Sequence, residues 1–439
     1  MAEKGSSISR REFVGAMALT GAMLASCGKS GSGSSARAPY QFPPLLDQAP
    51  DGAELKAGLI GCGGRGTGAS QNFLDAGPNL KIVAMADIFK DRVDRCRGTL
   101  KEQRGVTVPD NRCFVGLDAY TKLLELDLDL VIIATPPYYR PAQFKAAIKA
   151  GNHVFMEKPV TVDPVGARSI IETAGVAKTK GLNVVTGTQR RHQKCYVETF
   201  RRVMDGAIGD ITAARAYWNG GQLWYRPRQK GWSNLDWMIR DWVNWRWLSG
   251  DHIVEQHVHN IDVINWFVGD HPVKAVGAGS RQRRVTGDQF DNFAIDFEFA
   301  NGVHEFSMCR QVDGCSSNIS EYIVGTKGSS NCRDTIFNPD GSVAWKFEGE
   351  QKDPYIQEHI HLVTAIRTGD YVNEAERTAV STLTAIMGRT SAYTGAEVTW
   401  QEMMDSDMKS EAPKDTRGRI SPIAEVPVAG TGVREPRTD

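Results

Sequence analysis

The chain has 439 residues, more than one hydrophobic core usually organises, so the sequence predicts two folded domains. Its 52 Lys and Arg residues balance its 52 Asp and Glu residues, and the formal net charge is zero. This balance excludes the basic surface field that nucleic-acid binding needs, and it favours a neutral small molecule as the ligand.

The first 27 residues have the pattern of an export signal. Residues 9–13, SRREF, match the twin-arginine motif, and a short apolar segment rich in Gly and Ala follows. The segment ends in Leu-Ala-Ser before Cys27, which is similar to a bacterial lipobox. We therefore expect lipidation at Cys27 and a folded, periplasmic protein that touches the membrane only through this lipid anchor. Cleavage by an ordinary signal peptidase and a plain basic amphipathic N-terminus are the alternatives.

Residues 28–53 are rich in Ser, Gly and Pro and predict a linker. Beyond them, residues 54–188 alternate short β-rich runs with helical segments. The predicted strands are 55–61, 81–87, 129–135, 153–159 and 183–189, and the predicted helices are 67–77, 88–103, 141–151 and 166–181. This alternation implies right-handed βαβ crossovers, a parallel sheet and a ligand site at the carboxyl ends of its strands.

Residues 189–410 have a different pattern, with longer β-rich runs and two late helical segments. The runs are 211–219, 272–282, 292–311 and 318–328, and the helical segments are 356–369 and 374–395. We expect an α+β substrate-binding domain with a mostly antiparallel open sheet. Residues 411–439 are predicted to form an irregular tail.

A glycine-rich loop follows the first predicted strand and opens the first helix. Its G-x-G-x-x-G residues are Gly61, Cys62, Gly63, Gly64, Arg65 and Gly66. Glycines there allow a tight turn and let a pyrophosphate reach the helix N-terminus. Asp87 ends the next strand, where a carboxylate binds the adenosine ribose and repels a 2′-phosphate, so NAD is the expected cofactor rather than NADP. A Rossmann scaffold that holds no ligand is the alternative.

These motifs resemble those of the glucose–fructose oxidoreductase and inositol dehydrogenase (Gfo/Idh/MocA) family over residues 54–401. The likeness rests on the glycine loop, on Ala134-Thr135-Pro136, on residues 151–159 (GNHVFMEKP) and on a later His-x-x-Asp segment. It implies that Lys158 lies beside the nicotinamide and hydrogen-bonds the reacting hydroxyl. By the same resemblance, the remaining cofactor contacts are assigned to Thr135, Pro136, Glu157 and Gln189.

The resemblance also assigns a general base in the segment 250–262. His259 occupies the family's His position and Asp262 its trailing Asp, while Glu255 stands where Asp is usual. The implied catalytic residues are Lys158, His259 and Glu255, because a histidine near neutral pKa suits proton transfer at physiological pH. Arg191 and Tyr139 complete the expected substrate-binding set with these three.

A metal site built from His252, Glu255, His257 and His259 is an alternative for the same segment. The two histidines of His-x-His share a side only in an extended chain, whereas Glu255 and His259 align only in a helix. Contacts with sugar hydroxyls are therefore preferred, and no metal is assigned.

Seven of the ten Trp residues lie between residues 218 and 247. Indole faces stack on the apolar faces of sugar rings, so the cluster favours a carbohydrate ligand bulkier than a free monosaccharide. A hydrophobic core built from these tryptophans is the alternative.

The combined pattern predicts an NAD-dependent oxidoreductase acting on a secondary hydroxyl of a sugar or glycoside. An NAD-dependent glycoside hydrolase that oxidises C3 transiently, and a non-catalytic glycan-binding lipoprotein, are the alternatives. Because an exported protein meets no NAD pool, we expect the cofactor to be bound before export and regenerated in place. The open sheet is a candidate surface for homo-oligomers, as in the family.

Overall fold

The computed structural model describes residues 42–413 and 421–430. The predicted signal with Cys27 and most of the predicted linker lie outside the described residues. The described end of that linker belongs to the folded body, because Ala49 is buried in the core and its N–H donates to the Ala76 carbonyl. Arg367 also donates to the carbonyls of Pro50 and Ala53. The linker is therefore shorter at its C-terminal end than predicted.

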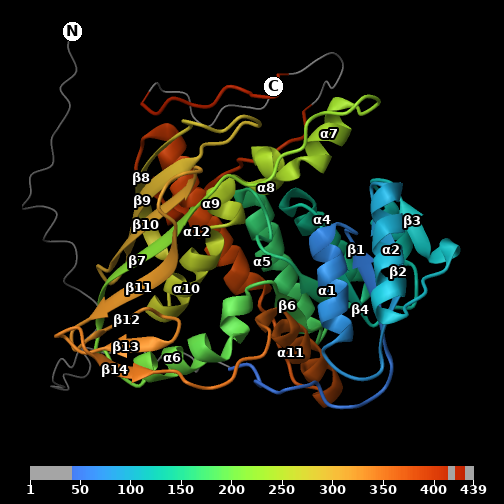
Figure 1. Cartoon of the computed structure of the whole chain (residues 1–439), viewed down its shortest axis with the longest axis horizontal. Helices are drawn as coiled ribbons and strands as arrows, with labels where there is room; N and C mark the ends of the chain where they lie inside the picture. The colour runs from blue at the N-terminus through green and yellow to red at the C-terminus, as the bar shows by residue number, and fades with distance from the viewer. Residues whose placement is uncertain (1–41, 414–420, 431–439) are drawn as a thin grey trace, which may run out of the picture. The chain divides into compact units, whose positions relative to one another are not determined.

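The first sheet has six parallel strands in the order β3-β2-β1-β4-β5-β6 (Figure 1). Its strands are β1 (Leu55–Ile60), β2 (Leu80–Asp87), β3 (Cys113–Val115), β4 (Leu130–Ile133), β5 (His153–Met156) and β6 (Val184–Thr186). This order reverses between β1 and β4, and ligands bind at such a switch point. The predicted parallel sheet is confirmed; β3 was not predicted because three residues carry too little pattern.

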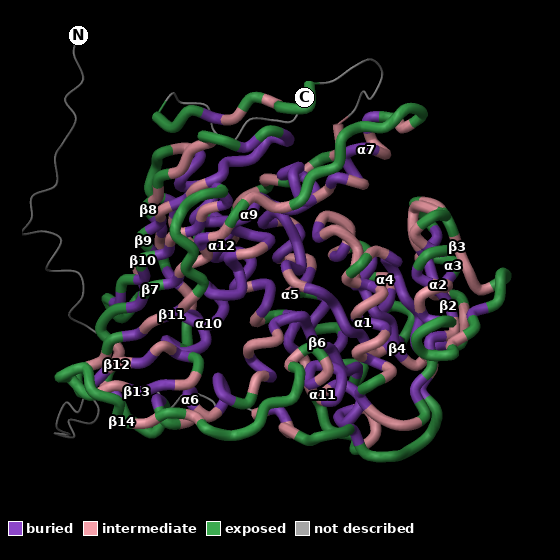
Figure 2. Tube along the Cα trace, in the orientation of Figure 1, coloured by how far each residue is buried: buried purple, intermediate pink, exposed green. Residues whose placement is uncertain are grey.

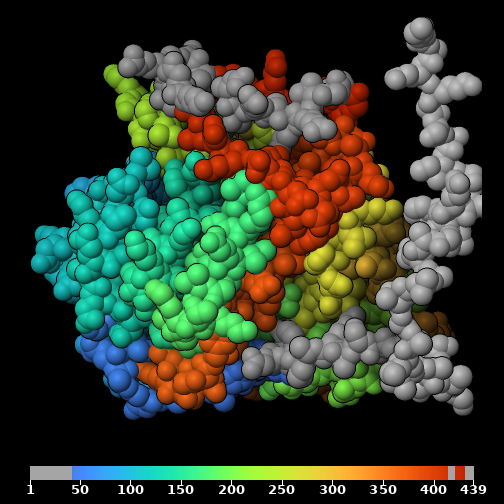
Figure 3. All heavy atoms as spheres, turned by 180° about the vertical axis from the view of Figure 1, so that it is seen from behind, coloured from blue at the N-terminus to red at the C-terminus, as the bar shows by residue number. Residues whose placement is uncertain are grey.

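Helices cover both faces of this sheet, and two of them come from the C-terminal half of the chain. One face packs against α1 (Gly64–Leu74), α2 (Lys90–Arg104) and α11 (Pro354–Thr368). The other packs against α3 (Ala119–Leu124), α4 (Arg140–Ala150), α5 (Pro164–Thr179) and the start of α12 (Ala375–Thr394). From behind, the orange atoms of α11 lie next to the blue atoms of the N-terminal half (Figure 3). The predicted boundary at residue 188 thus separates the two sheets but not the helices that cover them.

The second sheet has nine strands in the order β14-β13-β12-β11-β7-β10-β9-β8-β15. They are β7 (Ile211–Gly220), β8 (Pro272–Ser280), β9 (Asn292–Phe299), β10 (His304–Gln311), β11 (Asn318–Gly325), β12 (Ser329–Ser330), β13 (Thr335–Phe337), β14 (Val343–Lys346) and β15 (Val398–Thr399). All pairs are antiparallel except β7 with β10. The expected mostly antiparallel sheet is confirmed.

One face of the second sheet carries the domain's core. Alternate residues of β9, including Phe293 and Phe297, pack against α9 (His252–Glu255), α10 (Val258–Val268) and α12. The opposite face exposes side chains such as Val276 and Phe306. The buried, purple trace accordingly runs through the helices between the two sheets, while exposed segments outline the periphery (Figure 2).

The remaining elements are short and connect these layers. They are α6 (Lys194–Met204), α7 (Asn234–Arg240), α8 (Arg246–Ser249), α13 (Trp400–Asp405) and the 3-10 turns η1 (Asp110–Arg112), η2 (Pro137–Tyr139), η3 (Gln189–His192) and η4 (Trp242–Asn244). A capping box of Ser233 and Asp236 starts α7 in the Trp-rich segment. Within the described ranges, no helix combines the length and apolar character needed to cross a membrane.

Candidate active site

The glycine loop joins β1 to α1 and requires glycine at two positions. Gly61 has a φ of +98°, in the left-handed region. A Cβ on Gly66 would lie 1.8 Å from the Gly61 carbonyl oxygen, so any larger residue would push the loop open. A Cβ on Gly63 or Gly64 would meet nothing within 4 Å. These two glycines therefore leave open space at the N-terminus of α1, where its free N–H groups attract a phosphate.

Asp87 lies at the end of β2 and is fixed by the loop. Its carboxylate accepts hydrogen bonds from the backbone N–H groups of Cys62, at 2.7 Å, and Phe89, at 2.9 Å. Burial raises the pKa of this carboxyl group above its usual value. The Cys62 thiol faces away, toward the Ala86 carbonyl.

A cavity of about 350 Å³ connects these groups. Its lining includes Gly61, Gly63, Gly64, Arg65, Asp87, Thr135, Pro136 and Tyr139. An apolar groove that begins at a helix N-terminus and holds one carboxylate near its wall suits a dinucleotide. The residues present therefore fit NAD.

Glu157 and Gln189 lie where the strands β5 and β6 end. The Glu157 carboxylate accepts a hydrogen bond from Arg65 Nε at 2.5 Å and lies against Gly187, where an added Cβ would be only 2.4 Å from Glu157 Oε2. The side-chain oxygen of Gln189 is buried and has no hydrogen-bond partner among the described residues. Such an unpaired acceptor suits the carboxamide N–H group of a nicotinamide.

Lys158 follows β5 and contacts α9 of the second domain. Its Nζ donates to the backbone carbonyl oxygen of Glu255 at 2.6 Å and lies 3.3 Å from Glu255 Oε1. The two side chains are only 12% and 9% exposed. The ammonium group is therefore held in one position rather than mobile in solvent.

His259 lies in the first turn of α10, and its ring stacks on Trp218, with centroids 5.8 Å apart and planes at 21°. Burial lowers the pKa of His259 well below its usual value, and the charges of Lys158 and Arg190 lower it further. The imidazole is therefore neutral at physiological pH and able to accept a proton. In the part of the chain that the structure describes, no hydrogen bond engages this ring.

A break between α9 and α10 separates the four groups considered above for a metal site. His252 Nδ1 lies 3.2 Å from Asp251, and His257 Nε2 lies 2.7 Å from the Ser307 hydroxyl. Burial lowers the pKa of His257 to about 3. Two histidines thus belong to the core of the second domain, whereas Glu255 contacts Lys158 and His259 lies within reach of the Lys158 charge.

Three described residues elsewhere come close enough to share a metal ion: His192, His361 and Glu374. The Glu374 carboxylate there already accepts hydrogen bonds from Arg377 and from the Thr186 N–H. Burial by itself raises the pKa of Glu374, but the charge of Arg377, and then that of His192, holds it far below the usual range.

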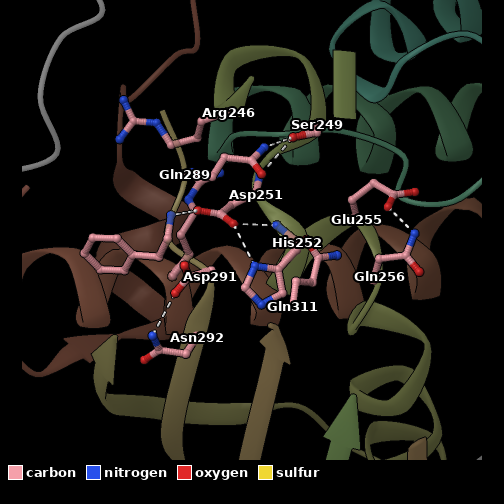
Figure 4. Close-up of polar contacts among 12 residues, drawn as sticks. Arg246, Ser249, Asp251, His252, Glu255, Gln256, Gln289, Asp291, Asn292 and Gln311 are labelled. Atoms are coloured by element: carbon pink, nitrogen blue, oxygen red, sulfur yellow. Dashed lines mark hydrogen bonds and ion pairs between the residues drawn. The ribbon is translucent and has the colours of Figure 1, made fainter. Parts of the chain in front are cut away.

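Asp251 anchors the start of α9 and was not predicted. It is fully buried and has a φ of +79°, a conformation that residues other than glycine rarely adopt. Its carboxylate accepts hydrogen bonds from the His252 N–H, the Phe290 N–H and the Tyr393 hydroxyl. Figure 4 shows Asp251 and His252 at one end of this segment and Glu255 with Gln256 at the other. The strained residue therefore fixes the helix that presents Glu255 to Lys158.

Two residues expected to bind substrate have other contacts. Arg191 donates to both carboxylate oxygens of Asp262, at 2.8 and 2.9 Å, and this ion pair is buried. Tyr139 lines the cavity near Asp87 and Thr135. The Asp262 partner of Arg191 lies 71 residues away, a distance that no local pattern reveals, and substrate binding by Arg191 stays a prediction.

The Trp-rich segment divides into three groups. Trp237, Trp245 and Trp247 are buried in a cluster with residues of both domains, and the partly buried Trp232 packs against it. Trp218 stacks on His259, and Trp224 and Trp242 line the cavity beside Asp87. Of this segment, only Trp218 is placed against a proposed catalytic residue.

Two family models match this chain. One, described as an oxidoreductase family with an NAD-binding Rossmann fold, covers residues 55–186, and the other, a GFO/IDH/MocA C-terminal domain, covers residues 196–331. Together they cover more than half of the chain, and residues 55–186 form an NAD-binding domain.

Curated relatives and a solved structure agree with these matches. An inositol 2-dehydrogenase/D-chiro-inositol 3-dehydrogenase of Halalkalibacterium halodurans is 28% identical over 49% of this chain and 53% of its own length. A glycosyl hydrolase family 109 protein of Streptomyces coelicolor is 27% identical over 47% of this chain and 43% of its own length. The chain therefore spans about half the length of these relatives. The structure of a Lactobacillus casei scyllo-inositol dehydrogenase with bound NAD(H) and scyllo-inositol has a TM-score of 0.60 at 20% identity, and the likeness covers 79% of this chain and 99% of that one.

Proposed function

Because the chain belongs to the GFO/IDH/MocA family of oxidoreductases, we propose that it oxidises a secondary hydroxyl of a sugar, sugar alcohol or glycoside and retains its NAD through turnover. The observation that carries this proposal is that Glu255 fixes the ammonium group of Lys158 close enough to His259 for its charge, after burial, to lower the pKa of that imidazole. Bound NAD supplies the acceptor for the hydride that leaves the carbinol carbon. The inositol dehydrogenase relatives support a polyol substrate.

The chain's own residues supply the acid–base part of this reaction. Lys158 donates a hydrogen bond to the substrate hydroxyl and stabilises the negative charge that develops on its oxygen. His259 accepts the hydroxyl proton, and Glu255 holds Lys158 in place. Trp218 supplies an apolar face beside His259 for the sugar ring. The products are a ketone, the reduced cofactor and one proton.

An NAD-dependent glycoside hydrolase is the second candidate. Its support is the match to a glycosyl hydrolase family 109 protein, whose name describes no net oxidation. The same Lys158 and His259 would serve a transient oxidation at C3, followed by elimination of the aglycone, addition of water and return of the hydride. The N-terminal export motif favours an enzyme that retains its cofactor over one that releases NADH after each turnover. An exported protein could not replace lost NAD from the cytoplasmic pool.

Incubation of purified protein with polyols and aryl glycosides distinguishes these candidates. NAD content is first measured after denaturation, and NADH absorbance and aglycone release are then followed together. A stoichiometric rise of NADH with a keto product supports the oxidoreductase, whereas aglycone release without a net change in NADH supports the hydrolase. If neither signal appears and Lys158→Met behaves like wild type, both proposals fail.

A further inference from the structure

The cavity that holds the NAD-binding residues has walls from both halves of the chain. Ile88, Phe89 and Arg92 follow β2 and flank Asp87 on the first domain's side. Trp224, Arg226, Ile239 and Trp242 line the same cavity from the Trp-rich segment. This second wall therefore lies outside the glycine loop and the strands of the Rossmann domain.

The position of this wall along the groove follows from Asp87. In a Rossmann domain the carboxylate after the second strand contacts the adenosine ribose, so the adenine lies beyond it, among the residues after that strand. Trp224 and Trp242 lie at this end, with their ring centroids 6.5 Å apart and their planes at 69°. Indole faces and guanidinium planes are the surfaces on which a nucleobase stacks.

Two guanidinium groups face this end of the cavity from opposite sides. The positive charge of Arg226 on the second domain contributes, after burial, to lowering the pKa of Arg92 on the first. The Arg226 side chain also lies over the Trp224 ring, with its guanidinium carbon 5.1 Å from the ring centroid. Cations and aromatic faces therefore surround the place where an electron-rich adenine would be held.

A separate ion pair, between Arg240 and Asp91, fixes the Trp-rich segment to the first domain; we call it the latch. Arg240, at the end of α7, donates two hydrogen bonds to the Asp91 carboxylate, at 3.0 and 2.6 Å. Its guanidinium also lies 3.8 Å from the Phe89 ring centroid and 4.8 Å from that of Trp232. The Arg240 side chain is only 14% exposed. An ion pair with this packing is held more firmly than an open surface pair.

Side chains of the second domain hold the backbone of residues 224–226 in place. The Asp241 carboxylate accepts a hydrogen bond from the Arg226 N–H at 2.7 Å, and Trp237 Nε1 donates to the Arg226 carbonyl at 2.6 Å. Asn244 donates to the Trp224 carbonyl at 3.2 Å. The residues that face the cavity are thus positioned by the second domain's own core.

We infer that the Trp-rich segment is the outer wall of the adenosine site and that Arg240 latches it over the bound dinucleotide. The C-terminal half of the chain therefore contributes directly to cofactor binding and slows NAD release. This inference deepens the proposed function and rests on it, since NAD that is retained through turnover must stay bound after it has been reduced.

The test measures NADH release from the full-length protein and needs no sugar substrate. NADH bound to wild type, Trp224→Ala, Arg240→Ala and Tyr225→Ala is chased with excess NAD, and the direct fluorescence of NADH is followed. Tyr225 is the matched control because it adjoins Trp224, is 51% exposed against 46% for Trp224, and is absent from the cavity lining. Near-ultraviolet circular dichroism and thermal unfolding verify that each variant is folded.

We expect Trp224→Ala and Arg240→Ala to release NADH about tenfold faster than wild type, and Tyr225→Ala to match wild type. Trp224→Ala should also weaken the binding of ADP-ribose and leave that of nicotinamide mononucleotide unchanged. The inference is overturned if the first two variants release NADH no faster than Tyr225→Ala. It is also overturned if Trp224→Ala weakens the binding of nicotinamide mononucleotide as much as that of ADP-ribose. Failure of the proposed sugar chemistry would leave these release rates unaffected, so the two failures are distinguishable.

Discussion

Lys158 Nζ lies 2.6 Å from the backbone carbonyl oxygen of Glu255, and this contact joins the end of β5 to the end of α9. The ammonium group therefore depends on both domains for its position. Because the acceptor is a backbone oxygen, a change of the Glu255 side chain leaves the shorter of the two contacts in place.

Replacement of Lys158 by Met should abolish most of the hydride transfer. Removing a group that stabilises developing charge typically costs about a hundredfold or more in rate. Lys145→Met, at an exposed position on α4, is the control for the loss of a positive charge. Single-turnover NADH formation with excess substrate measures the rate, and equal rates in the two variants would exclude Lys158 from the chemistry.

Glu255→Gln should have a much smaller effect than Lys158→Met. The backbone contact keeps Lys158 in place, whereas the ion pair at 3.3 Å is lost. We expect a loss of about tenfold in kcat, with NADH affinity unchanged. If Glu255→Gln is as slow as Lys158→Met, the carboxylate itself takes part in proton transfer.

The pH dependence of catalysis should reflect the lowered pKa of His259. Burial is the main cause and Lys158 the next, so the neutral base persists below the ordinary histidine pKa of about 6.5. The acid limb of kcat/KM should therefore lie below that pH. In Lys158→Met one positive charge is gone, and the His259 titration followed by nuclear magnetic resonance should move upward. A His259 titration at its ordinary value in wild type would contradict this expectation.

Asp251 should tolerate glycine better than alanine. Its φ of +79° strains any side chain, and both substitutions remove the acceptor of the Tyr393 hydroxyl. We expect Asp251→Gly to be more stable than Asp251→Ala by about 1 kcal/mol, measured by urea unfolding. Tyr393→Phe isolates the hydrogen bond, with a loss of about 1–3 kcal/mol. Equal stability of the glycine and alanine variants would show that the backbone is not strained there.

Glu358 offers a test of stability against pH. Both of its carboxylate oxygens are buried without a partner among the described residues, and burial, then Glu157, raises its pKa well above 4.5. The folded state keeps a proton on Glu358 that the unfolded state releases above pH 4.5. Proton binding therefore favours the folded state less and less as pH rises, and the free energy of unfolding falls. Glu358→Gln should therefore be more stable than wild type in alkaline buffer, by about 1–3 kcal/mol, with the difference shrinking toward pH 4.5. Thermal unfolding at several pH values measures this, and a constant difference would disprove the account.

Local signals in the sequence were sufficient for much of the fold. The central strand β4 is a continuous apolar run, and helices such as α2 and α4 end at glycines in the left-handed conformation, Gly105 and Gly151. The loop from Gly61 to Gly66 and the carboxylate of Asp87 belong to one short motif, and the structure places them around one cavity.

The unpredicted features depend on partners far apart in the chain. Asp251 meets Tyr393 across 142 residues, and Arg191 meets Asp262 across 71. The tryptophans were ambiguous for a similar reason, since a core indole and one lining a ligand cavity have the same local sequence. Their roles depend on which elements pack beside them, and tertiary contacts decide that.

The return of α11 to the first sheet has a consequence for synthesis. Ile360 and Val363 of this helix fill the core beside α1, and the Arg65 guanidinium of the glycine loop lies 4.7 Å from the ring centroid of Tyr355. The nucleotide domain is thus encoded first but receives α11 only after the ribosome has translated strands β7 to β14 of the second sheet. A nascent chain stalled before residue 354 would leave the apolar surface that α11 covers beside α1 exposed, and it would be a target for chaperones and proteases.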